Sequence, residues 1–364
     1  MTYVAIEEAF AVPELAARQP VTEMRIRVTD SYARMCGRKL VDFEHHRLPE
    51  MDAHGIDVQV LSLTVPGIQA DTDPVAARAN ARLANDFLAE VIARHPTRFQ
   101  GFAALPTQDP GAAVAELERA VADLGFRGAL VNDHTHGRYL DDPDYDELWS
   151  AFEELGVPLY LHPGSVPADD WHVLTGRPEL YGATWSWQAE TGGHALRLVY
   201  AGVFDRHPAA TVILGHLGEF LPFQKSRLDS RYRTLLVDRP LRRAPSAYIG
   251  TNILITTSGV LSPDAIEAAV LTTGEDAVMF SVDYPYEDTA AAVAAVERAE
   301  LTNEVKDKVA HRTARRVLGL PNPEPAATSP ASTRDKESDH RCAENRDWQR
   351  GRPGSPSASS PDSP

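Results

Sequence analysis

Acidic and imidazole side chains directly follow short apolar runs at widely separated places in this chain. The residues with this spacing are Glu7, His162, His216 and Asp283. Imidazole nitrogens and carboxylate oxygens together suit a borderline divalent ion such as Zn²⁺ or Mn²⁺, because the carboxylates also neutralise its charge. Taken singly, each residue has an ordinary alternative role, since such a His is usually hydrogen-bonded and such an acid often caps a helix or starts a turn. Their recurrence at four comparable positions favours a metal site.

The elements that must position these residues are short and alternate in type. Most of the apolar runs are continuously hydrophobic, which is typical of parallel strands covered by helices. Apolar residues at helical spacing fill the intervals, for example over residues 74–94 and 110–124. Strands that alternate with helices in this number predict a (β/α)₈ TIM barrel, an α/β fold. The predicted strands are residues 3–6, 58–63, 99–104, 128–131, 157–161, 211–214, 253–257 and 277–281.

In such a barrel the carboxyl ends of all strands meet at one rim, so the four candidate ligands would converge there. An open, doubly wound sheet is the alternative fold. When it binds nucleotides, a glycine-rich turn usually follows its first strand, and this sequence has none. Residues 11–48 are long for a first strand-to-helix loop, so we expect an insertion over the barrel mouth.

The composition excludes several classes of partner. A formal net charge of −16 repels both nucleic acid and anionic lipid, and no run approaches the ~18 uninterrupted apolar residues of a membrane span. Cys36 and Cys342 form no metal or redox motif. We expect no signal peptide, because no basic stretch followed by an apolar one lies near residue 1, and the predicted location is cytoplasmic.

A change of composition divides the chain into two parts. Residues 321–364 are rich in Pro, Ser and charged residues and contain few large apolar side chains. Such a segment cannot bury enough apolar surface to offset the entropy of ordering it. We therefore expect a catalytic barrel over residues 1–320 and a disordered tail over residues 321–364.

Longer strings around the candidate ligands carry a family resemblance. The sequence resembles the amidohydrolase-related decarboxylases, a family that includes aminocarboxymuconate-semialdehyde decarboxylase. It is most similar to the 2,3-dihydroxybenzoate, salicylate and γ-resorcylate decarboxylases, and the resemblance covers roughly residues 3–320. Each string alone is a weak signal, but together they are specific. The strings are residues 5–10, 51–56, 102–110, 128–132, 161–163, 190–197, 213–219, 256–259 and 280–287.

The resemblance implies a fold, a cofactor and roles for particular residues. It implies an amidohydrolase-like barrel, one divalent metal ion and a homodimer or homotetramer that acts on a small aromatic acid. Mn²⁺ or Zn²⁺ is favoured as the ion, and Mg²⁺ is compatible with the same ligands. By the family pattern the metal ligands are Glu7, His162 and Asp283. His216 and Glu219 form a proton-handling pair, and Asn132 and Arg227 lie near the substrate.

Ala9 departs from the pattern of many of these relatives, which carry His at the corresponding place, two residues after the ligating Glu. Hydrolytic members of the wider superfamily have a His-x-His motif on the first strand. Ala9 therefore argues against a metal-dependent amidohydrolase or lactonase, which is the main alternative on the same barrel. A barrel that only binds a partner is the second alternative, and the polar residues at the strand ends disfavour it.

The implied reaction is a non-oxidative decarboxylation of an ortho-hydroxylated aromatic acid, which would make the protein a carbon–carbon lyase. Asp283 is the hypothetical acid that protonates the ring carbon bearing the carboxylate, after which CO₂ departs. His216, oriented by Glu219, would take the phenolic proton. The substrate among salicylate, dihydroxybenzoates and resorcylic acids stays open at this point, and reverse carboxylation is compatible with the same site.

Overall fold

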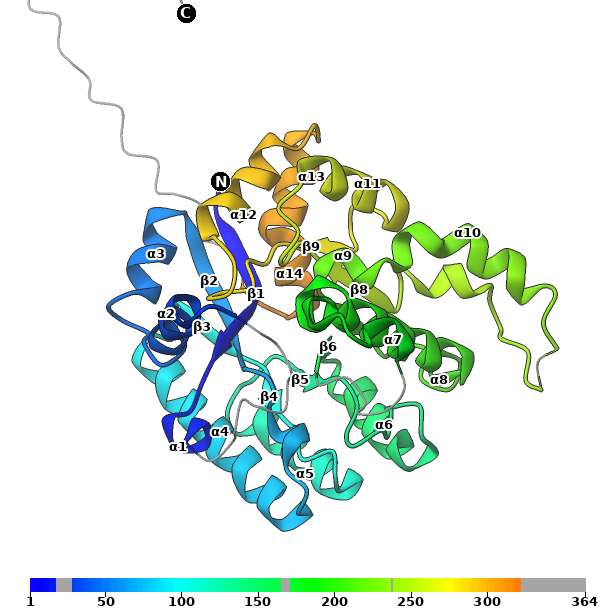
Figure 1. The fold of residues 1–364 in the computed structure, drawn as a ribbon, viewed down its shortest axis with the longest axis horizontal. Coiled ribbons are helices and arrows are strands. Elements are labelled where there is room, and N and C mark those ends of the chain that lie inside the picture. The colour runs from blue at the N-terminus through cyan, green and yellow to red at the C-terminus, as the bar shows by residue number, and fades with distance from the viewer. Residues whose placement is uncertain (18–27, 165–170, 237, 322–364) are drawn as a thin grey trace, which may run out of the picture. The chain divides into compact units, whose positions relative to one another are not determined.

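The computed structural model describes residues 1–17, 28–164, 171–236 and 238–321, which lie in one compact unit spanning Met1–Asn322. Its strands form a central barrel surrounded by helices (Figure 1). Apart from Pro321, the tail predicted to be disordered lies outside the described residues. The strands are β1 (Tyr3–Phe10), β2 (Ile56–Leu63), β3 (Phe99–Gly101), β4 (Ala103–Ala104), β5 (Ala129–Asn132), β6 (Leu159–His162), β7 (Val212–Leu214), β8 (Ile253–Thr256) and β9 (Val278–Met279).

All strand pairings are parallel, and the order follows the chain. β1, β2 and β3 form one run of paired strands, and β4 to β9 form another. Phe102 joins β3 to β4 and donates its amide to the carbonyl of Leu61, so the two short strands act as one stave of the barrel. The amide of Ala9 donates to the carbonyl of Tyr284 at 2.8 Å and closes the ring between β1 and the segment after β9. The predicted (β/α)₈ barrel is confirmed.

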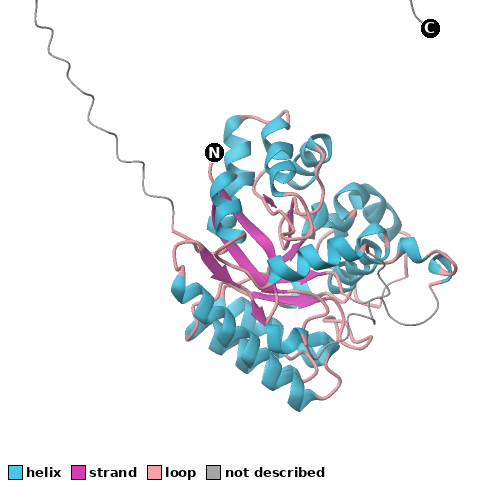
Figure 2. Ribbon diagram, turned by 60° about the vertical axis from the view of Figure 1, so that its left-hand side comes forward, coloured by secondary structure: helices cyan, strands magenta, loops and turns pink. Residues whose placement is uncertain are grey.

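Helices cover the outside of the strands, as the cyan ribbons around the magenta arrows show (Figure 2). Aspartates cap several of them by accepting backbone amides, for example Asp73 before α4 and Asp109 before α5. The helices are α1 (Pro13–Ala16), α2 (Asp30–Leu40), α3 (Arg47–Ala53), α4 (Pro74–Arg94), α5 (Pro110–Ala122), α6 (Asp146–Leu155), α7 (Ser186–Tyr200), α8 (Val203–Arg206), α9 (His216–Glu219), α10 (Leu221–Tyr232), α11 (Pro263–Thr273), α12 (Thr289–Arg298), α13 (Asn303–Asp307) and α14 (Thr313–Val317).

The hydrophobic core has two layers that follow from strand alternation. A larger cluster lies between strands and helices, and a smaller one fills the barrel interior with side chains such as Val4, Ile6 and Tyr160. None of the helices in the described residues is both long and apolar enough to cross a membrane.

A β-bulge in β1 changes which side chains face the barrel interior. Ala5 pairs with Gln59 and Glu8 with Leu61, so three steps along β1 match two along β2. The extra residue turns Glu7 into the barrel, where it follows Ile6, and it places Glu8 on the outer face beside Gln59. Bulges of this kind commonly re-aim a side chain next to an active site.

The segment of residues 11–48, predicted to be an insertion, contributes α1 and α2, although residues 18–27 within it lie outside the described part of the chain. The hydroxyl of Tyr32 on α2 donates to the carbonyl of Tyr286 at 2.8 Å. The buried Cys36 on the same helix lies near the carbonyl of Pro285. The inserted helix α2 therefore packs against the loop that follows β9, which also carries Asp283.

Candidate active site

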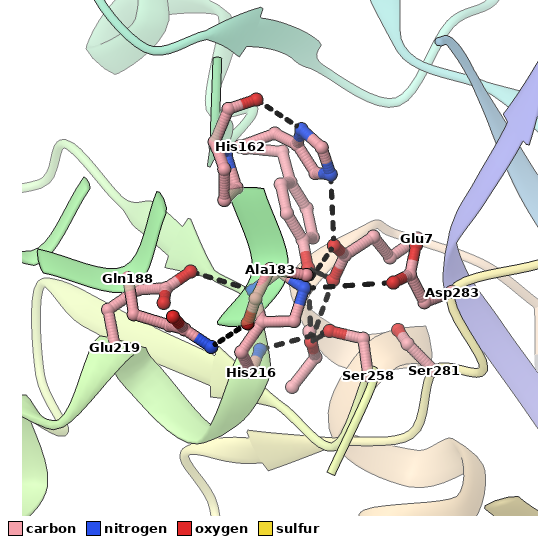
Figure 3. A network of polar contacts seen from close by, with 12 residues as sticks. Glu7, His162, Ala183, Gln188, His216, Glu219, Ser258, Ser281 and Asp283 are labelled. Carbon is pink, nitrogen blue, oxygen red and sulfur yellow. Dashed lines mark hydrogen bonds and ion pairs between the residues drawn. The ribbon is translucent and has the colours of Figure 1, made fainter. Parts of the chain in front are cut away.

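Three of the predicted ligands meet at the carboxyl ends of the strands. One potential ligand atom from each of Glu7, His162 and Asp283 lies within 4.8 Å of the other two. They come from β1, β6 and the loop after β9, and Figure 3 shows their side chains pointing toward one another. Residues separated by more than a hundred positions in the chain therefore share one small volume, as a closed barrel requires.

Hydroxyl groups hold one oxygen of Glu7 and leave the other free. Its Oε2 accepts a hydrogen bond from the hydroxyl of Tyr160 and lies 3.3 Å from Oγ1 of Thr256. Its buried Oε1 makes no hydrogen bond, and it lies 3.3 Å from Nε2 of His162 and 3.5 Å from Nε2 of His216. A Cβ atom at position 215 would lie 2.7 Å from Oε2, so only glycine fits beside this carboxylate.

The charge of Glu7 is stabilised inside the barrel. Burial by itself raises the pKa of this carboxyl, but the imidazoles of His216 and His162 outweigh burial and hold its pKa at about 2. A permanently ionised carboxylate with one unsatisfied oxygen is a donor that a divalent cation would satisfy. The residues present therefore fit a metal ion.

His162 is oriented by two oxygens at Nδ1. This nitrogen lies 3.0 Å from Oδ1 of Asn132 and 2.7 Å from the carbonyl oxygen of Pro163. Both neighbours are acceptors, so Nδ1 donates to them, and Nε2 is the nitrogen that faces Glu7. A metal-binding histidine coordinates through one ring nitrogen while the other donates a hydrogen bond that fixes the ring plane. Asn132, predicted to lie near the substrate, thus contacts His162.

His216 lies between a buried carboxylate and the predicted ligands. Its Nδ1 is 2.7 Å from Oε1 of Glu219, and its Nε2 is 3.8 Å from Oδ2 of Asp283. Burial lowers the pKa of His216, but Glu219 and Glu7 raise it more, and the result lies well above the usual value. The predicted pair of His216 and Glu219 is therefore in hydrogen-bond contact and reaches toward Asp283 (Figure 3).

Asp283 stands on a backbone that few non-glycine residues adopt. Its φ of 74° places it in the left-handed region, and its carbonyl accepts the amide of Tyr286 at 2.8 Å. Burial raises the pKa of Asp283, and the neighbouring Glu7 adds to this, whereas His216 opposes it. A partly buried carboxyl whose protonated form is favoured can serve as an acid.

A pocket adjoins these three residues. Its apolar lining residues include Ala9, Leu63, Val65 and Leu130. Ser62, Thr64 and Tyr286 also line the pocket, and Thr64 and Tyr286 are hydrogen-bonded to each other. A lining that combines these ionisable side chains with apolar ones suits a mostly apolar ring that carries a charged group.

The remaining predicted site residue lies apart from this cluster. Arg227 is exposed on α10, and its guanidinium forms no hydrogen bond or ion pair with any residue that the structure describes. Nothing within the described chain thus links Arg227 to Glu7, His162 or Asp283.

Sequence reasoning did not anticipate the hydroxyls that hold Glu7. Tyr160 lies two positions before His162 on β6, so both side chains face the barrel interior, and this period of two was a usable signal.

A second buried pair was also missed. Nδ1 of His194 on α7 lies 2.7 Å from Oδ1 of Asp133, and its Nε2 accepts the amide of Leu140 at 2.9 Å. Asp133 directly follows Asn132, so this pair supports the loop next to His162.

Comparison with known proteins identifies the group to which the chain is similar. A family model described as amidohydrolase matches residues 37–320. The γ-resorcylate decarboxylase of Rhizobium radiobacter is 41% identical over 325 residues, which cover 87% of this chain and 98% of that protein. A crystal structure of 2,6-dihydroxybenzoate decarboxylase with bound 2,6-dihydroxybenzoate has a TM-score of 0.83 at 40% identity, covering 88% of this chain and 100% of the other.

A third relative contains a metal ion. The crystal structure of dihydroxybenzoic acid decarboxylase from Polaromonas, with bound manganese and the inhibitor 2-nitroresorcinol, has a TM-score of 0.81 at 37% identity. The alignment covers 88% of this chain and 97% of the Polaromonas chain. These identities extend over nearly the whole length of each relative, so they concern the complete barrel and not one motif. The chain therefore belongs to the amidohydrolase family, within the group of the γ-resorcylate and dihydroxybenzoate decarboxylases.

Proposed function

We propose that this protein is a metal-dependent carbon–carbon lyase that removes CO₂, without an oxidant, from an ortho-hydroxylated aromatic carboxylic acid. The observation that carries the proposal is the convergence of ligand atoms of Glu7, His162 and Asp283 within 4.8 Å, beside a pocket whose other lining residues are partly apolar. The relatives that match over almost their full length are named decarboxylases of dihydroxybenzoic acids. Dihydroxybenzoates of the γ-resorcylate type are therefore the first substrates to test.

Glu7, His162 and Asp283 are the proposed metal ligands. The Oε1 of Glu7, which makes no hydrogen bond, and the Nε2 of His162 support this assignment, since they lie 3.3 Å apart. Manganese is the proposed ion, because a similar decarboxylase contains it. When bound at these residues, the ion would orient the acidic substrate and offset its negative charge.

Asp283 is proposed to donate a proton to the ring carbon that bears the carboxylate. A new C–H bond forms there, the ring loses its aromaticity, and the C–CO₂ bond then breaks. The electron pair of that bond returns to the ring, CO₂ leaves, and solvent reprotonates Asp283. Burial and Glu7 raise the pKa of Asp283 in the metal-free protein, whereas a bound cation lowers it, so the transfer depends on exchange of Asp283 within the complex.

His216 and Glu219 are proposed to handle the phenolic proton. The 2.7 Å contact between Nδ1 of His216 and Glu219 directs Nε2 of the imidazole toward Asp283 and the cavity. Nε2 would accept the proton of the ortho hydroxyl, so the oxygen could feed electron density into the ring. The buried carboxylate of Glu219 would stabilise the resulting imidazolium.

The apolar lining residues of the pocket are proposed to contact the face of the substrate ring, while the metal site holds the substrate carboxylate. Leu63, Val65 and Leu130 would exclude water from the reacting carbon. Asn132 and Arg227 remain proposed substrate-side residues by the family pattern, Asn132 through its contact with His162. A homodimer or homotetramer and a cytoplasmic location also remain predictions.

A CO₂-release assay on purified, manganese-loaded protein tests the function. The substrates are salicylate, 2,3-dihydroxybenzoate, 2,6-dihydroxybenzoate and orsellinate, with benzoate and 4-hydroxybenzoate as matched acids that lack the ortho hydroxyl. We expect CO₂ from at least one ortho-hydroxylated acid and none from the two controls. Absence of CO₂ from every acid, together with hydrolysis of an amide or lactone, would instead establish the hydrolase alternative.

A further inference from the structure

The second glutamate of β1 occupies a fully buried position outside the barrel interior, and the mechanism above makes no use of it. Glu8 is 0% exposed. Its Oε1 accepts the backbone amide of Val282 at 2.9 Å, and its Oε2 accepts the backbone amide of Tyr284 at 3.3 Å. These two amides flank Asp283 on either side. One carboxylate thus holds the peptide groups before and after the proposed proton donor.

Other buried groups hold Glu8 in turn. Nε2 of Gln59 donates to Oε2 of Glu8 at 3.4 Å, and Nη1 of Arg47 donates to Oε1 of Gln59 at 3.0 Å. Arg47 is itself 0% exposed, and its guanidinium lies over the ring of Tyr284 at 4.2 Å. Oxygens buried this deeply need such donors, because without them their burial would be strongly unfavourable. The network therefore fixes Glu8 in one position.

The conformation of Asp283 shows why a clamp is needed there. A non-glycine residue at φ 74° is strained, and it persists only where its surroundings determine the backbone. The carbonyl of Asp283 is held by the amides of Tyr286 and Glu287, at 2.8 and 3.2 Å. Glu8 adds a restraint by accepting the neighbouring amides of Val282 and Tyr284. Released from Glu8, this backbone could relax and carry the carboxylate away from His162 and Glu7.

We propose that Glu8 is a positioning residue for the reaction, and that its carboxylate sets the backbone of residues 282–284 so that Asp283 faces the metal ligands and the substrate carbon. This inference rests on the proposed function for the role of Asp283. The bulge in β1 makes the arrangement available, since it turns Glu7 rather than Glu8 into the barrel interior after Ile6. Glu7 thereby enters the site, while Glu8 orients another residue of that site from behind.

Two variants of Glu8 and one matched control test the proposal. Glu8→Ala removes both acceptors. Glu8→Gln keeps the shape and one carbonyl acceptor, so it retains the bond to one of the two amides. The control is Asn252→Ala, because Asn252 is also buried and binds two backbone carbonyls, those of Pro208 and Ala210, at 3.0 and 2.9 Å. It precedes β8 and so lies at the opposite end of the barrel from the site.

The measurements separate positioning from general stability. For Glu8→Ala we expect kcat to fall about 100-fold with little change in KM, the scale expected when a reacting group is misplaced by about 1 Å. We also expect the Kd for Mn²⁺, measured by titration of the metal-free protein, to rise about tenfold. Glu8→Gln should recover part of both losses. Asn252→Ala should lower the Tm but leave kcat and the Kd for Mn²⁺ at their wild-type values.

The outcomes decide the matter whichever variant folds. If folded Glu8→Ala retains wild-type kcat and Mn²⁺ affinity, the proposal is wrong. If Glu8→Ala does not fold, the same two values in Glu8→Gln decide it, and wild-type values there also overturn the proposal. If the wild-type protein releases no CO₂ from any acid, the proposed function fails instead, and the difference in Mn²⁺ affinity between Glu8→Ala and Asn252→Ala still tests the clamp.

Discussion

The two rims of the barrel differ in which residues adopt left-handed backbone conformations. On the amino-terminal side, glycines do so, among them Gly55 and Gly128 directly before β2 and β5, and Gly250 shortly before β8. On the carboxyl side, glycines such as Gly67, Gly218 and Gly259 also do so, but non-glycine residues join them. Those with positive φ among the described residues are Asp133, His136, His216, Leu217, Glu219, Phe220 and Asp283, and every one of them follows β5, β7 or β9.

The difference distinguishes turns that only redirect the backbone from turns in which the residue must also supply a functional side chain. Glycine enters the left-handed region without steric cost, whereas a residue with a Cβ is strained there by roughly 1–3 kcal/mol. Three of the seven residues, His216, Glu219 and Asp283, belong to the candidate site. The rim that holds these side chains retains the strain because glycine could not supply an imidazole or a carboxyl. The hydrogen bonds around them, such as those from Glu8 and Glu219, offset it.

Replacing the proposed acid on the carboxyl rim should have the largest effect. Asp283→Asn keeps the size of the side chain but removes its proton, so we expect kcat for CO₂ release to fall by at least about 10³-fold. The measurement is CO₂ release at saturating substrate, with substrate binding followed separately by fluorescence titration. Asp264→Asn, in the exposed first turn of α11, is the control and should retain full activity. Near wild-type turnover in Asp283→Asn would remove the proton-donor role.

Loss of the proposed ligand His162 on the same rim should mainly lower the affinity for the metal ion. His162→Ala deletes the imidazole whose Nε2 faces Glu7, and we expect the affinity for Mn²⁺ to fall by more than about 100-fold, with activity lost in parallel. Elemental analysis after dialysis checks the metal content. His45→Ala, at a largely exposed histidine, should keep its metal. A fully active His162→Ala protein with unchanged metal content would contradict the ligand assignment.

The fold could be predicted from the sequence because each barrel strand is a short apolar run. The residues at which the strands end could not be predicted in the same way. The run predicted at residues 277–281 contains only Val278–Met279 as a strand. Beyond it, the amide of Phe280 donates to the carbonyl of Val309 and that of Ser281 to the hydroxyl of Thr257. These partners lie outside the strand ladder, and no pattern within residues 277–281 could reveal them. Helix starts were more predictable, since Asp109-Pro110 signals a cap locally.

The candidate site was readable where residue type and strand position coincide. Glu7, His162 and Asp283 are polar residues at the ends of apolar runs, and the barrel topology alone brings them together. The role of Glu8 could not be predicted, because in a strand the residue next to Glu7 faces away from the site. The bulge that decides which of the two glutamates faces inward depends on pairing with β2. Tyr160 and Thr256 were not predicted to belong to the site, because in the sequence they resemble ordinary core residues of their strands.

Replacing the carboxylate of Glu219, which contacts His216, should lower kcat moderately and change its dependence on pH. Burial lowers the pKa of His216 and Glu219 raises it, so Glu219→Gln should lower this pKa. If neutral His216 accepts the phenolic proton, activity rises as pH passes its pKa, and that limb of the profile should move to lower pH in the variant. We expect kcat at its optimum to fall about 10- to 100-fold. A pH–rate profile whose limb does not move would argue against this role for the pair.

The smallest effect on catalysis should come from a change on the opposite rim. A Cβ atom at Gly250, where φ is 95°, would lie 2.2 Å from the carbonyl oxygen of Thr273, so Gly250→Ala should destabilise the fold by more than about 2 kcal/mol. Its kcat and Mn²⁺ affinity, measured well below its Tm, should stay at wild-type values. Gly193→Ala, on α7 with open space around the new methyl group, should not lower the Tm. A selective loss of Mn²⁺ affinity in Gly250→Ala would mean that strain at the amino-terminal rim reaches the site along β8, and the two rims would not be independent.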